Sequence, residues 1–208
     1  MNSYRRTLAI TAIISTLSIP VLAQSASDPG SQNKETFTDP SIASEAAQMV
    51  PAKAILTRTL DADKDQPNST IEASLRGKVT LSDGTVLPSN TVLIGEITRD
   101  DVQQAGTSEL ALRFNQAQLK NGKTVPIKAT IVEMMAPGAD ADAPNDWTDQ
   151  MLEVNQIDVV SGVDLHSKIA SDNSGIFVST KKHDVKVPDG SELQLAIGPT
   201  GGASMPTS

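Results

Sequence analysis

One stretch of the chain spaces its carboxylates as a calcium-binding loop does. In DADKDQPNSTIE, Asp61, Asp63 and Asp65 occupy positions 1, 3 and 5 of the EF-hand pattern, and Glu72 occupies position 12. Position 6 should be Gly for the sharp turn and is Gln66, and the preceding AILTRTL has a strand-like pattern rather than a helical one. We therefore favour a solvated acidic connection between strands, and a calcium-binding module is the alternative.

A second acidic stretch surrounds the only tryptophan. DADAPNDWTD holds four aspartates around Trp147, namely Asp140, Asp142, Asp146 and Asp149. Four carboxylates could bind a cation or a basic partner, but a block of like charges usually stays solvated, so we expect an acidic loop. Large aromatic side chains are mostly buried, and Trp147 is therefore expected to plug the barrel, with an anchor for a contact as the alternative.

Two histidines, His166 and His183, are the only ones available for acid–base or metal chemistry. Zinc sites use three or four convergent ligands, and the chain has no Cys. The sequence also lacks the H-E-x-x-H, G-x-S-x-G and Gly-rich phosphate-binding motifs. Surface or capping roles are expected for both histidines, and we predict no catalytic, cofactor-binding or metal-binding residue and no cofactor. An exported hydrolase with a shallow site is the alternative, because Ser, His and Asp are all present.

Short apolar runs bounded by turn residues must position these side chains, and they predict an all-β fold. The expected strands cover residues 53–60, 70–81, 90–97, 109–114, 124–134, 175–180 and 192–197. Their period-two alternation and their content of Val, Ile and Thr are typical of strands, and no window shows a sustained helical pattern. We expect a small barrel or sandwich of roughly seven to nine short strands.

Turn residues separate these runs, and one turn motif recurs three times. Gly84, Gly122 and Gly190 each follow Asp or Asn, and such pairs readily adopt the positive φ angles of tight hairpins. Each glycine is therefore predicted to close a hairpin. Pro88 and Pro126 have no N–H to donate, so they are expected at strand starts, edges or bulges.

The first 23 residues have the three parts of a secretory signal. Arg5 and Arg6 form a basic start, residues 8–19 form an apolar run, and the small Ala23 precedes the expected cleavage point. The run is short for a membrane span, which needs about 20 residues. A cleaved signal and a periplasmic or secreted location are expected, and an uncleaved anchor is the alternative.

Composition divides the rest of the chain into three parts. Residues 24–49 are expected to be a flexible tether ending in a short helix with Ser41 as its N-cap. Residues 50–198 are the β domain, and residues 199–208 form a Gly-rich and Pro-rich tail that is predicted to be disordered. The net charge of −8 disfavours nucleic acid and anionic lipid as partners. An aromatic content of 2% argues against an outer-membrane barrel, which carries aromatic girdles.

With these elements placed, residues 50–97 (VPAKAILTRTLDADKDQPNSTIEASLRGKVTLSDGTVLPSNTVLIGEI) resemble a known family. It is the VirB10/TrbI-like scaffold family of conjugation and type IV secretion, in its C-terminal β-barrel domain. The phrase LPSNTVLIG carries the resemblance, and ELALRFNQAQLKNGKTVPIKATI continues it to Ile131. Asn90 stands where the family phrase usually has Gly, and the family's pore-forming helical insertion has no counterpart here. The resemblance implies a reduced, free-standing barrel that keeps a scaffolding surface and forms no channel.

These observations predict a non-enzymatic exported β-barrel domain that acts as an envelope scaffold or binding module. Its expected partners are envelope proteins, with no nucleic acid and no transmembrane segment after signal cleavage. The exported hydrolase and the calcium-binding module stay open as alternatives.

Overall fold

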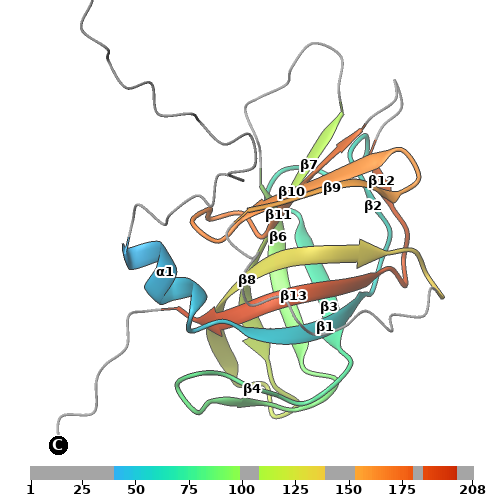
Figure 1. The fold of residues 1–208 in the computed structure, drawn as a ribbon. Helices are drawn as coiled ribbons and strands as arrows, with labels where there is room; N and C mark the ends of the chain where they lie inside the picture. The colour runs from blue at the N-terminus through green and yellow to red at the C-terminus, as the bar shows by residue number, and fades with distance from the viewer. Residues whose placement is uncertain (1–39, 99–107, 139–152, 180–184, 201–208) are drawn as a thin grey trace, which may run out of the picture. The chain divides into compact units, whose positions relative to one another are not determined.

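Six antiparallel strands close into a barrel in the computed structural model (Figure 1). They are β1 (Val50–Leu56), β3 (Thr70–Leu75), β6 (Val92–Thr98), β7 (Glu109–Gln118), β8 (Thr124–Met135) and β13 (Glu192–Pro199). Each pairs with the next of the six in chain order, and β13 pairs back onto β1. The structure describes residues 40–98, 108–138, 153–179 and 185–200, which all lie in one compact unit, Phe37–Ser208. The predicted all-β fold is confirmed, as a barrel rather than a sandwich.

Seven further strands lie outside the closed ring. They are β2 (Leu60–Asp61), β4 (Val79–Thr80), β5 (Val86–Leu87), β9 (Glu153–Val160), β10 (Val163–Lys168), β11 (Gly175–Ser179) and β12 (Lys186–Val187). β4 pairs with β5, β2 pairs with β12, and β11, β10 and β9 extend the sheet from β7. The thirteen described strands exceed the seven to nine that were expected. The excess comes from two-residue strands and from β9 and β10, whose many polar residues weaken the apolar pattern.

Alternate residues of the ring strands fill the barrel. The burial of β3 and β6 alternates along each strand, as period-two patterning predicts. The largest fully buried side chains include Leu56, Ile71, Leu93, Leu112, Phe114, Ile127 and Phe177. Each such side chain contributes roughly 1.5–3 kcal/mol on transfer from water. β13 is buried along nearly its whole length, consistent with its place between β1 and β8.

A loop residue, Ser174, completes the barrel wall where β7 and β8 separate. These strands pair only near their connecting turn, over three residues each. Beyond that point, the N–H of Ser174 donates to the Leu112 carbonyl (2.7 Å), and the N–H of Ile131 donates to the Ser174 carbonyl (2.7 Å). The Ser174 hydroxyl accepts the Phe114 N–H at 2.9 Å. Ser174 is 1% exposed, so its three bonds replace a missing stretch of ladder.

Two of the three predicted hairpins are confirmed. Gly84 and Gly122 have φ angles of 85° and 80°, and they close the β4–β5 and β7–β8 hairpins. Both turns use the preceding side chain in the same way. The Asp83 carboxylate accepts the Thr85 N–H at 2.8 Å, and the Asn121 amide oxygen accepts the Lys123 N–H at 3.0 Å. Asx side chains stabilise turns by such local bonds.

The prediction that Gly190 closes a hairpin is wrong. Gly190 does turn the chain with a φ of 79°, and the Ser191 N–H donates to the Pro188 carbonyl. However, the strands on either side do not pair with each other, because β12 pairs with β2 while β13 pairs with β1 and β8. The local turn chemistry was identified correctly, but the partner of β13 lies far away in sequence.

The prolines and Asn90 lie where their backbone chemistry allows. Pro88 follows β5 and starts a turn in which its carbonyl accepts the Thr91 N–H and hydroxyl. Asn90 has a φ of 60° in that turn, so it supplies the positive φ expected of a Gly there. Pro126 faces Gln116 of β7, and pairing with β13 starts only at the next residue. Pro126 therefore lies at an edge as predicted, whereas Pro88 lies in a turn after β5 and not in a strand.

A short helix, α1 (Pro40–Ala46), precedes the barrel. It starts at Pro40, so Ser41 lies inside its first turn and is not the N-cap that was predicted. Proline is favoured at this position because its missing N–H would have no helical partner. Lys128 of β8 forms an ion pair with Glu45 of α1 at 2.6 Å, which ties the helix to the barrel wall. The predicted signal, most of the tether and residues 201–208 lie outside the described residues.

Candidate functional site

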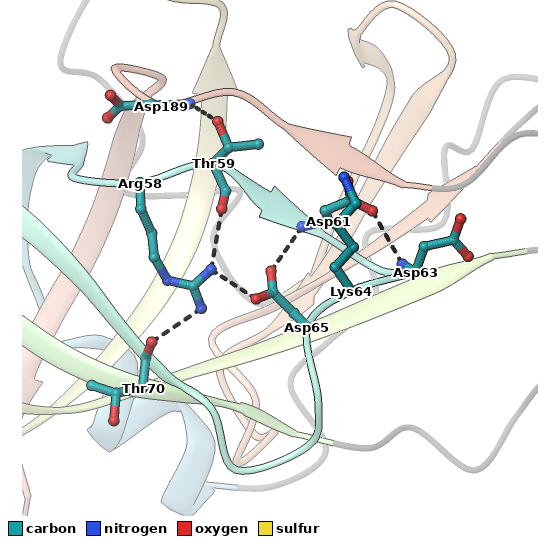
Figure 2. A network of polar contacts seen from close by, with 8 residues as sticks. All are labelled: Arg58, Thr59, Asp61, Asp63, Lys64, Asp65, Thr70 and Asp189. Carbon is teal, nitrogen blue, oxygen red and sulfur yellow. Dashed lines mark hydrogen bonds and ion pairs between the residues drawn. The ribbon is translucent and has the colours of Figure 1, made fainter.

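The predicted calcium loop lies between β2 and β3 and is organised around an arginine (Figure 2). The Arg58 guanidinium donates to Asp65 Oδ1 at 2.8 Å and to the carbonyls of Thr59 and Thr70 at 3.1 Å. The second Asp65 oxygen accepts the Asp61 N–H at 2.8 Å. Both oxygens of the Asp65 carboxylate therefore accept hydrogen bonds from the protein itself, and the cation that neighbours it is the Arg58 guanidinium.

Asp61 is also satisfied by neighbours. Its Oδ1 accepts the Asp63 N–H at 3.2 Å, and its Oδ2 lies 3.3 Å from the Lys64 ammonium. Partial desolvation acts to raise the pKa of Asp61, but the hydrogen bond and charge of Lys64, the Asp63 N–H and the charge of Lys186 outweigh it. The pKa of Asp61 therefore lies below its usual value of 3.8.

These contacts do not assemble the calcium cage that the spacing suggested. Glu72, the predicted twelfth ligand, is exposed on β3, and its backbone carbonyl accepts the Thr57 N–H and hydroxyl. Across the described ranges, no group of three or more His, Asp or Glu side chains is placed to hold a metal ion. The EF-hand spacing is thus met in sequence while the backbone follows a β connection instead of a helix–loop–helix.

The other candidate residues are less informative. His166 lies exposed on β10, where its Nδ1 is 2.7 Å from the Asn155 amide oxygen of β9. This neighbour is an amide, so the contact does not supply the carboxylate of an acid–base pair. His183, Trp147 and the four aspartates around Trp147 lie outside the described residues.

A groove that was not predicted lies between β1 and β4. We call it the β1–β4 groove; it encloses about 370 Å³ and is lined by Pro51, Ala52, Lys53, Arg76, Gly77, Lys78 and Val79. It exists because β3 pairs with β1 only as far as Ala54↔Leu75. The chain then turns away into the β4–β5 hairpin, which Figure 1 shows beside β1.

Charge distinguishes this groove from the rest of an acidic chain. Lys53, Arg76 and Lys78 line it, and the carboxylate of Glu192 on β13 lies behind the first two. The Lys53 ammonium is 3.9 Å from Glu192 Oε1, and the Arg76 guanidinium is 3.6 Å from Oε2. Glu192 is 8% exposed, yet its Oε1 accepts no hydrogen bond from any described residue. Among the described residues that line or back the groove, three cations stand against one carboxylate.

A second hollow, of about 320 Å³, lies between α1 and the barrel. Its two charged lining residues, Glu45 and Lys128, pair with each other, so the hollow carries no surplus charge. The β1–β4 groove is consequently the stronger candidate for recognition of a charged partner.

Sequence reasoning missed the groove for an identifiable reason. Period-two alternation places Lys53 on the outer face of β1, and Arg76, Gly77 and Lys78 mark the end of the β3 pattern. The clustering of these residues depends on the β1–β13 register, Ile55↔Glu192, which brings Glu192 near them. That register links residues more than a hundred positions apart and has no local signal.

Comparison with known proteins adds no assignment, because no protein-family model matches the chain and no curated protein matches its sequence significantly. Among the residues that the structure describes, no helix has the length and apolarity required to cross a membrane.

Proposed function

We propose that the chain is a non-enzymatic, exported β-barrel domain that binds an envelope partner through the β1–β4 groove. The observation that carries this proposal is the groove itself, which Lys53, Arg76 and Lys78 line and in which the first two approach the buried carboxylate of Glu192. Clefts with a surplus of one charge attract partners of the opposite charge and accelerate their association.

The barrel supports recognition by holding both walls of the groove in place. β1 is paired with β13 along most of its length and with β3 at its C-terminal end. The opposite wall is anchored because the Arg76 N–H donates to the Lys53 carbonyl at 2.8 Å and Val79 pairs with Leu87. A wall fixed before binding loses little conformational entropy when the partner arrives.

Export and a scaffolding role complete the proposal. The N-terminal signal pattern supports export to the periplasm, and the phrase LPSNTVLIG supports kinship with the VirB10/TrbI-like scaffold family. In the structure this phrase forms the turn after β5 and the first part of β6, so it contributes to the ring of the barrel. A reduced barrel of this kind would present a binding surface without forming a channel.

Copurification from crosslinked bacterial cells tests the proposal. Wild type should capture an envelope protein that the double variant Arg76→Gln, Lys78→Gln does not capture. The matched control is Lys120→Gln, Lys123→Gln, which removes the same charge from the exposed β7–β8 turn and should capture the partner normally. Equal capture by all three proteins, or capture by none of them, would refute the groove as the binding surface.

A further inference from the structure

The β1–β4 groove runs along a strand edge. The Arg76 N–H donates to the Lys53 carbonyl, and beyond that bond β1 has no strand partner on this side among the described residues. β4 lies close to β1 without a backbone ladder between them. The next residue of β1 whose backbone faces this side is Pro51, which has no N–H, so a segment bound along β1 would be held by side-chain contacts and not by a continuous backbone ladder.

The groove also has an apolar floor beneath its charges. Ala52 and Val79 are 5% and 7% exposed, while Lys53 and Arg76 have side chains that are 35% and 61% exposed. Gly77 leaves room in the wall, because a Cβ built there meets no atom within 4 Å. A segment that alternates apolar and acidic side chains would place the first toward the floor and the second toward the cations.

From these features we propose that the groove binds an extended acidic segment of a partner protein, laid alongside the N-terminal half of β1. This inference rests on the proposed function and names its partner chemistry. Charge complementarity selects the acidic segment, since three cations face the groove and Glu192 offsets one of them. The net charge of −8 repels large polyanions such as nucleic acid or an anionic membrane, whereas a short segment meets only the local charge.

The adjoining hairpin offers the partner an apolar contact. Val86 of β5 pairs with Thr80 of β4, and both are exposed, so they lie on the outer face of the hairpin. At 43% exposed, Val86 is the only exposed large hydrophobic side chain among the described residues. Apolar anchors beside charged rims are typical of protein interfaces rather than of sites for small anions.

Fluorescence anisotropy with a short labelled peptide of alternating Val and Glu tests the inference on the chain without residues 1–23. We expect saturable binding that weakens by about tenfold in the variant Arg76→Gln, Lys78→Gln, because two partly exposed charge pairs are lost. Glu192→Gln should bind about two- to fivefold more tightly, since it removes the competing carboxylate. Lys120→Gln, Lys123→Gln should bind as wild type does.

A variant without charge change separates shape from electrostatics. Gly77→Leu places a side chain in the groove at a position with no positive φ, and it should abolish peptide binding while leaving the fold intact by circular dichroism. If the Arg76 variant unfolds, Lys78→Glu serves in its place, because the ion pairs of Glu192 are with Lys53 and Arg76 and Lys78 lies at the exposed wall.

Three results would overturn the inference. A peptide of alternating Gly and Glu that binds equally well would show general charge attraction without use of the apolar floor. Binding of inorganic polyphosphate or phosphatidylglycerol vesicles in place of the peptide would assign the groove to another anion. Absence of peptide binding, with envelope capture still lost in the Arg76→Gln, Lys78→Gln variant, would refute the peptide while leaving the proposed function intact.

Discussion

Gly95 of β6 lies directly against the backbone of Arg113 on β7. A Cβ at Gly95 would stand 2.2 Å from the Arg113 carbonyl oxygen and 2.9 Å from the Cα of Phe114. The register between β6 and β7 shifts at this point, between Ile94 and Gly95, so the strands approach closely across a bulge. The close packing of β6 on β7 therefore explains why LPSNTVLIG ends in a glycine, and no ligand or reaction is needed to explain it.

Gly95→Ala should destabilise the barrel by about 2–4 kcal/mol, because backbone atoms must move to admit the methyl group. Urea unfolding monitored by circular dichroism measures the effect. Gly77→Ala is the control, since its Cβ meets nothing within 4 Å, and it should change stability by no more than about 0.5 kcal/mol. Similar stabilities for the two variants would contradict the close approach of β6 and β7.

Ser174→Ala should cost about 1–3 kcal/mol, because it leaves the buried Phe114 N–H without its hydroxyl acceptor. Amide hydrogen exchange should show Phe114 losing protection before the β1–β13 ladder does. Ser82→Ala, in the exposed β4–β5 turn, is the matched control and should have little effect. An unchanged Phe114 exchange rate in Ser174→Ala would mean that the loop does not complete the wall.

The contribution of Asp61 to stability should depend on pH in a defined direction. Its pKa is lowered in the folded state, so its charge stabilises the fold above about pH 3.8 and this stabilisation is lost as the pH falls through the folded value. The difference in unfolding free energy between wild type and Asp61→Asn should be measurable at neutral pH and should disappear in strong acid. A difference that stays constant across this range would show that Lys64 and the Asp63 N–H do not act on this carboxylate.

The sequence predicted those parts of the fold whose interacting residues are close together in the chain. Gly84 and Gly122 were identified because an Asp-Gly or Asn-Gly turn and both of its strands are contiguous. Gly190 shows the limit, since its turn is local but β13 pairs with strands formed much earlier in the chain. β10 had only a weak signal, because its buried positions are Val163, Leu165 and the polar Ser167.

Site prediction failed in a different way. The EF-hand spacing of Asp61, Asp63 and Asp65 is real in the sequence, but Arg58 lies beside the loop and takes the place of a cation at Asp65. An arginine seven positions before a carboxylate is too common to have been read as its partner. The β1–β4 groove depends on where β3 separates from β1 and on the position of Glu192, neither of which is encoded in a nearby motif.

The export prediction has a direct chemical readout. Protein expressed from the full sequence in a bacterial host should be recovered from the periplasm with Gln24 as its first residue, because the small Ala23 precedes the expected cleavage point. N-terminal sequencing and intact mass measure this. A protein retaining Met1 in the membrane fraction would instead indicate the uncleaved anchor.

Site-specific photo-crosslinking in living cells tests the central claim most directly. A photoreactive residue at position 78, on the groove wall, is compared with one at position 123, on the exposed β7–β8 turn. We expect a discrete envelope-protein adduct from position 78 that is absent from position 123 and is lost when Arg76→Gln is added. No adduct from position 78, or the same adduct from both positions, would contradict it.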